Sequence, residues 1–125
     1  MKANPQIVPS RPLLVAAGLS GALGIGLSAM SAHRPDLPNL GTAAAMLMFH
    51  APAFAALSLM AGNRLRHFAS LALAVGLILF AGDIATRAYL GTRLFPMAAP
   101  SGGMLMIAGW LGIAASAFWP AGRNR

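Results

Sequence analysis

The sequence contains no cysteine and only two acidic residues, Asp36 and Asp83. Without cysteine the chain can form neither a disulfide bond nor a thiolate metal site. Two carboxylates are too few for a site that binds a metal through oxygen ligands, and no set of nucleophile, base and orienting group can be recognised. We therefore expect no enzymatic activity, no metal site and no cofactor.

Charge is scarce in general, and apolar side chains are abundant. Charged residues make up 9% of the 125 positions and apolar residues 58%, with a mean hydropathy of +0.69. Such a chain is too apolar for a soluble protein and too short for several domains. A helix that crosses about 30 Å of hydrocarbon needs about 20 largely apolar residues. Suitable runs occupy residues 13–32, 40–62, 68–90 and 98–119.

The links between these runs are short, and consecutive helices must therefore run antiparallel. Most prolines lie in the links or at the ends of the runs, where they start or stop helices, and only Pro52 lies well inside one. The sequence thus predicts a single all-α membrane domain, an antiparallel up-down bundle of four transmembrane helices. The first run could also be a cleaved secretory signal, since Lys2 and Arg11 precede it, but it is longer than a usual signal core.

The basic residues indicate the orientation in the membrane. Six would lie on the side of the two termini and three on the other; these are Lys2, Arg11, Arg64, Arg66, Arg123 and Arg125 against Arg34, Arg87 and Arg93. By the positive-inside rule both termini are expected in the cytoplasm, and the protein in the inner (cytoplasmic) membrane of a bacterium. Because the positive charge is spread over both sides, the net charge of +7 does not predict nucleic-acid binding.

Small residues predict where the helices pack closely. In a bilayer the hydrophobic effect contributes little to helix association, so small side chains that let backbones approach carry much of it. Two sets fall on helix faces at suitable spacing, Gly21, Gly24 and Ser28 in the first run and Gly102, Gly103 and Gly109 in the fourth. These faces could contact another subunit or, as we favour, other helices of the same chain.

Three polar side chains lie inside the predicted spans. Asp83 and Arg87 are four residues apart, which places them on one helix face and predicts a local ion pair; a subunit contact or a transported ion are the alternatives. His50 lies near mid-membrane beside Pro52, so it could hydrogen-bond across the bundle or, as in a transporter with a broken helix, mark a binding site. A contact between His50 and Asp83 is possible because their depths are similar.

Two further histidines carry weaker signals. His33 lies at a helix end and His50 much deeper, so the two are not expected to ligate one haem iron from both sides. His67 follows Arg64 and Arg66 in the second link, a basic segment suited to anionic lipid headgroups.

Several stretches resemble a known family. LSGALGIGLSAMSAH, MFHAPAFAAL and GLILFAGDIATRAYLGTRLFPMAAPSGGMLMIAGWL are similar to the small four-helix membrane proteins of the domain of unknown function 423 family, which includes the transmembrane protein 256 group. The resemblance implies a four-helix membrane protein without an established reaction, cofactor or ligand. Asp83 and Arg87 depart from the family pattern, which usually has serine at the first position and an apolar residue at the second.

These observations favour a non-enzymatic protein that packs against other membrane helices. We expect it to be an accessory or stabilising subunit of a larger complex, or a homo-oligomer, with membrane lipid and other membrane subunits or further copies of itself as partners. The alternative is a small transporter or ion pathway that uses a buried cluster of His50 and Asp83.

Overall fold

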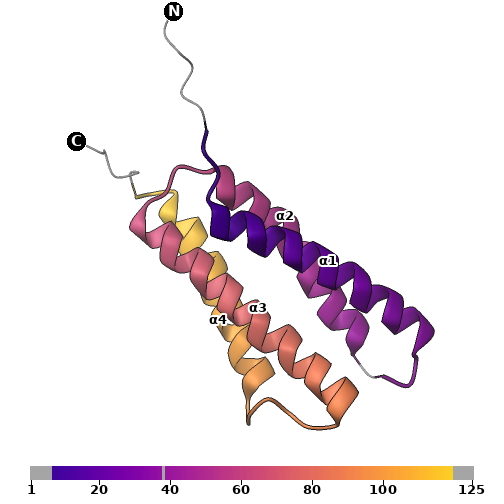
Figure 1. Ribbon diagram of the computed structural model, residues 1–125. Coiled ribbons are helices and arrows are strands. Elements are labelled where there is room, and N and C mark those ends of the chain that lie inside the picture. The colour runs from indigo at the N-terminus through magenta and orange to yellow at the C-terminus, as the bar shows by residue number, and fades with distance from the viewer. Residues whose placement is uncertain (1–6, 38, 120–125) are drawn as a thin grey trace, which may run out of the picture.

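The described residues form four helices, and each is long and apolar enough to cross a membrane. The computed structural model describes residues 7–37 and 39–119. The helices are α1, Arg11–His33; α2, Leu40–Leu59; α3, Arg64–Leu90; and α4, Ala98–Ser116 (Figure 1). Within the described residues there is no strand. The predicted all-α architecture of four helices is therefore confirmed.

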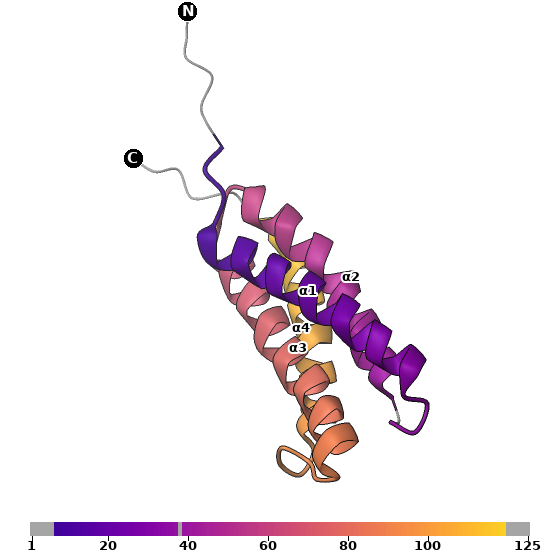
Figure 2. The same cartoon turned by 45° about the vertical axis from the view of Figure 1, so that its right-hand side comes forward.

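The helices are arranged as two antiparallel hairpins. α1 packs along α2 and α3 packs along α4, whereas the contact between the hairpins is smaller and is made mainly by α2 and α3. Figures 1 and 2 show the hairpins close together where α1 begins and α4 ends, and diverging toward the opposite end. The bundle is thus two tightly packed pairs joined along one seam.

Some helix ends differ from the ends of the predicted spans. α3 begins at Arg64, four residues before the apolar run, because the side chain of Asn63 accepts a hydrogen bond from the backbone N–H of Arg66. α2 ends at Leu59, where Met60 adopts an extended conformation. Hydropathy indicates which residues suit lipid, but backbone hydrogen bonds and caps decide where a helix begins and ends.

The C-terminus of α3 depends on Gly91. This residue has a φ of 69°, in the left-handed region where glycine meets no Cβ penalty, and its N–H donates to the carbonyl oxygen of Arg87. The chain can therefore turn sharply after Leu90 and return toward α4. This return brings the loop over the polar end of α3.

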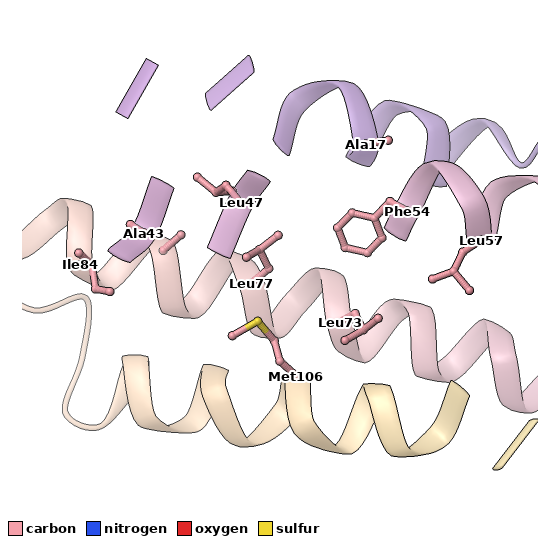
Figure 3. Close-up of a cluster of buried hydrophobic side chains, with 10 residues drawn as sticks. Ala17, Ala43, Leu47, Phe54, Leu57, Leu73, Leu77, Ile84 and Met106 are labelled. Atoms are coloured by element: carbon pink, nitrogen blue, oxygen red, sulfur yellow. The ribbon is translucent and has the colours of Figure 1, made fainter. Parts of the chain in front are cut away.

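Buried apolar side chains collect where the two hairpins meet. Most come from α2 and α3, with one residue each from α1 and α4; they are Ala17, Ala43, Leu47, Phe54, Leu57, Leu73, Leu77, Ala81, Ile84 and Met106. Figure 3 shows Phe54 and Leu77 in the space between α2 and α3, with Met106 reaching toward them from α4. This core holds the hairpins together by close packing.

The link between α1 and α2 contains an exposed ion pair. Arg34 donates from Nε and Nη2 to the two carboxylate oxygens of Asp36, at 2.9 and 2.7 Å. These hydrogen bonds lower the pKa of Asp36 below its ordinary value. One of the two acidic residues thus lies at the end of the molecule opposite the start of α1.

Candidate functional site

α3 and α4 approach each other closely at their glycines. A Cβ atom on Gly76 would lie 2.7 Å from the carbonyl oxygen of Gly102, and a Cβ on Gly102 would lie 2.6 Å from the carbonyl oxygen of Gly76. Further along, a Cβ on Gly109 would lie 2.9 Å from the carbonyl oxygen of Ala69. Gly103 lies at the edge of this contact, because a Cβ there would have Cδ2 of Phe80 as its nearest neighbour, at 3.9 Å.

The small residues of α1 pack against α2. A Cβ on Gly24 would lie 2.6 Å from Cγ of Met48 and 3.2 Å from the carbonyl oxygen of Ala44, so the backbones approach closely here. Gly21 faces Ala51 at an ordinary distance of 3.7 Å. Ser28, by contrast, is exposed and lies outside this contact. Gly21 and Gly24 of α1 thus pack against another helix of the same chain.

A second line of small residues on α1 faces outward. Gly18, Ala22 and Gly26 are spaced four residues apart and all are exposed; we call them the outer strip. Apart from the chain neighbours and the backbone of α1 itself, no atom of the described residues lies within 4 Å of the Cβ position at Gly18 or at Gly26. These residues were not among those predicted from the sequence to pack, although their spacing of four is a recognisable signal for helix packing.

An apolar groove opens beside the outer strip. It has a volume of about 510 Å³ and lies between α1, α2 and α3. Leu19 and Leu23, which directly follow two residues of the strip, form one wall, and Leu77 and Ala81 of α3 contribute to the other. The diverging hairpins therefore leave an apolar recess next to the outer strip of α1.

Asp83 is almost completely buried and connects α3 to the following loop. Its side chain is 1% exposed, and its Oδ2 lies 3.1 Å from Nη2 of Arg87, whose side chain is 36% exposed. The backbone N–H of Leu94 donates to the other carboxylate oxygen at 2.9 Å. The ion pair matches the spacing in the sequence, but the bond to Leu94 depends on the course of the loop, which the sequence did not reveal.

His50 connects α2 to α4. Nδ1 of His50 lies 2.8 Å from the carbonyl oxygen of Met46, and Nε1 of Trp110 lies 3.3 Å from Nε2 of His50. Because an indole N–H can only donate, Nε2 accepts and the ring proton resides on Nδ1, which donates to Met46. The ring of His50 is buried and also faces Phe54. The hydrogen bond across the bundle that was considered for His50 thus has Trp110 as its partner.

His50 and Asp83 do not form one polar cluster. Each makes its hydrogen bonds to other groups, and among the described residues no hydrogen bond joins the two side chains. Pro52 lies on the exposed side of α2, whereas His50 faces the core. The similar depth of His50 and Asp83 suggests a contact between them. In the structure, however, the two residues lie on different hairpins and have different partners.

Polar contacts also hold the other end of the bundle. The amide nitrogen of Asn63 donates to the carbonyl oxygens of Ser116 and Trp119, at 3.3 and 3.1 Å, while its oxygen caps α3. Arg66 donates from Nη1 to the carbonyl oxygen of Ala61 and from Nε to the hydroxyl of Ser116. Sequence reasoning missed Asn63, although an asparagine before an apolar helix is a known cap signal.

Comparison with known proteins agrees with the predicted resemblance. The family model described as Protein of unknown function (DUF423) matches residues 15–103. The chain belongs to the DUF423 family. No curated protein and no solved structure matches it.

The DUF423 match includes most of the candidate site. It covers α2 and α3 with His50, Asp83 and Arg87, and it ends at Gly103 in the first turns of α4. Trp110, the partner of His50, lies beyond the matched range. Among the described residues, no group of three or more histidine, aspartate or glutamate side chains could hold a metal ion.

Proposed function

We propose that this DUF423 protein is a non-enzymatic membrane protein that packs against other membrane helices. It would act as an accessory or stabilising subunit of a larger complex, or as a homo-oligomer. The observation that carries the proposal is the outer strip, because Gly18 and Gly26 leave open space on an exposed helix face. In lipid, a face of small residues is stabilised most when another helix packs against it, because the two backbones can then approach closely.

The two faces of α1 support this interpretation. The face with Gly24 is already covered by α2, and there the absence of a side chain permits backbone contact. The outer strip has the same kind of residue but no covering helix within the described chain. Leu19 and Leu23 border the adjacent groove, so an incoming helix could place its larger side chains there while its backbone approaches the strip.

The proposed location is the inner membrane of a bacterium, with both termini in the cytoplasm. The support is the excess of lysine and arginine on the side of the termini. The alternative of an ion pathway through His50 and Asp83 has less support, because each side chain is bound to a different part of the chain.

The test compares association before and after the outer strip is filled. Gly18→Leu and Gly26→Leu place side chains in open space, so the fold of the monomer should be preserved. Ala56→Leu, at an exposed position on α2, is the matched control. Wild type and control, solubilised from membranes in mild detergent, should contain a second copy or a stoichiometric partner by native mass spectrometry, and the strip variants should lose it. A wild-type monomer without any partner would contradict the proposal.

A further inference from the structure

α1 and α3 begin, and α2 ends, at the same end of the molecule (Figure 1). The side chains at this end enclose a second recess. It has a volume of about 450 Å³, and we call it the basal pocket. Its polar lining consists of Ser10, Ser58, Arg66, His67 and Ser70. Apolar side chains form the rest of the wall; they include Ile7, Val8, Leu13 and Leu57. The pocket is thus amphipathic, with cationic and hydroxyl groups next to an apolar wall.

The backbone around the basal pocket is held in place. The N–H of Ser10 donates to the carbonyl oxygen of Ser58 at 2.8 Å and ties the start of α1 to the end of α2. Arg66 is fixed by its bonds to Ala61 and Ser116. A guanidinium group has more N–H donors than these two bonds use, so Arg66 retains donors for an anion.

The charge around the pocket has one sign. The only acidic residues of the chain are Asp36 and Asp83. Asp36 lies in the link after α1 and Asp83 is bound near the end of α3, both toward the opposite end of the bundle. Arg66 and His67 therefore have no carboxylate side chain nearby to satisfy them, and an exposed Arg64 adds to the positive potential.

The pocket also lies at the level of a membrane interface. It lies at the ends of three helices that are long enough to span the bilayer. Phe68 and Trp119 are exposed at the same end, where amphipathic aromatic rings prefer the headgroup region. A ligand at this level would have its charge among the headgroups and its apolar part beside α1 and α2.

We propose that the basal pocket binds the phosphate headgroup of an anionic phospholipid. Arg66 and His67 donate to the phosphate oxygens, the hydroxyls of Ser10 and Ser70 provide further hydrogen bonds, and the acyl chains follow the apolar wall toward the bilayer. A zwitterionic lipid offers the same phosphate, but its ammonium group would meet the positive potential of this end. The site therefore prefers phosphatidylglycerol to phosphatidylcholine. This inference is independent of the packing function proposed above.

The test measures lipid binding to the purified full-length chain by native mass spectrometry. Phosphatidylglycerol and phosphatidylcholine are titrated separately in mild detergent, and inorganic phosphate is added in a third experiment. We expect phosphatidylglycerol to bind at least about fivefold more tightly than phosphatidylcholine, and inorganic phosphate not to displace it. Equal binding of the two lipids would overturn the proposal, and displacement by millimolar phosphate would show that free phosphate is the ligand instead.

Variants then locate the site. His67→Gln removes an exposed side chain that makes no hydrogen bond within the described residues, so it should not affect folding. Arg66→Gln removes the guanidinium group, and Arg66→Lys keeps its charge. We expect His67→Gln and Arg66→Gln each to weaken phosphatidylglycerol binding about fivefold, and Arg66→Lys to weaken it less.

Arg64→Gln is the control for Arg66→Gln, because it removes the same charge from the same helix turn outside the pocket. If Arg64→Gln weakens binding as much as Arg66→Gln, the attraction is general and the pocket proposal is wrong. The melting temperature of each variant without lipid is measured as well. Weaker binding of phosphatidylglycerol by Arg66→Gln supports the proposed site only if His67→Gln also binds this lipid more weakly.

Discussion

The indole of Trp110 donates a hydrogen bond to the buried imidazole of His50, and this bond joins α2 to α4 across the core. This bond adds a polar contact between helices to the apolar cluster that α2 and α3 share. Because His50 also binds the carbonyl oxygen of Met46, both ring nitrogens are occupied. Both nitrogens of the buried His50 ring thus serve to hold the structure together.

Trp110→Phe should destabilise the protein by about 1 kcal/mol. The ring still packs, but Nε2 of His50 loses its donor in a buried environment. Unfolding in detergent, followed by circular dichroism, measures the change. Trp119→Phe is the control, since Trp119 makes its hydrogen bonds within the described residues through its backbone and not through its indole. Equal effects of the two substitutions would show that the bond contributes nothing.

Asp83 and Arg87 should respond unequally to neutralisation. Arg87→Gln leaves a carboxylate that is 1% exposed without its counterion and should cost about 3 kcal/mol. Asp83→Asn leaves Arg87 without its partner, but the arginine is partly exposed and can turn toward water. The amide oxygen of the new asparagine can still accept the hydrogen bond from the backbone N–H of Leu94. Asp83→Asn should therefore cost less.

The double variant Asp83→Asn/Arg87→Gln provides the control for this pair. With both charges removed it should be more stable than Arg87→Gln alone, because no buried charge is left unpaired. Chemical unfolding of the four proteins gives the coupling free energy. A double variant as unstable as the sum of the two single variants would show that the residues do not interact.

The glycine contact between α3 and α4 should tolerate no side chain. Gly102→Ala would place a Cβ 2.6 Å from the carbonyl oxygen of Gly76, and the helices would have to separate, at a cost of about 1–3 kcal/mol. Gly103→Ala is the matched control on the next residue, where a Cβ meets only ordinary contacts. It should be neutral or slightly stabilising, since alanine favours the helix. The comparison uses thermal unfolding of both variants, and similar losses of stability would contradict the contact.

The four helices and their order could be predicted from the sequence because both follow from local composition. Long apolar runs, prolines at their ends and short links leave few alternatives in a bilayer. The pairing of Asp83 with Arg87 could also be predicted, because residues four apart on a helix lie on one face.

Contacts between distant residues were harder to predict. Gly76 stands among larger aliphatic residues, and only the position of α4 reveals that its backbone contacts Gly102. Likewise, similar depth suggested a partner for His50 on α3, but the rotation of each helix about its axis decides that partner, and it is Trp110 on α4. Hydropathy carries little information about helix rotation when nearly all residues are apolar.

The exposed pair in the first link should have a small, pH-dependent effect. Hydrogen bonds from Arg34 lower the pKa of Asp36 in the folded protein, so the contribution to stability is present above the ordinary pKa of 3.8 and is lost as the pH falls through the lowered value. Because both side chains are exposed, Asp36→Asn should leave the melting temperature at neutral pH nearly unchanged. Melting temperatures of both proteins between neutral and strongly acidic pH test this, and a large loss at neutral pH would contradict it.

Asn63 makes two kinds of hydrogen bond, and two substitutions separate them. Asn63→Ser keeps a side-chain oxygen that can cap α3 but loses the amide that donates to the carbonyl oxygens of Ser116 and Trp119. Asn63→Ala loses both, and its cost should include about 1 kcal/mol for the cap alone.

We therefore expect stability to fall in the order wild type, Asn63→Ser, Asn63→Ala. Hydrogen exchange then shows where each variant is weakened. In Asn63→Ser the amides near Ser116 should exchange faster while those of the first turn of α3 stay protected, because only the link to α4 is lost. Faster exchange confined to α3 in both variants would mean that the bonds to α4 do not hold the two helix ends together.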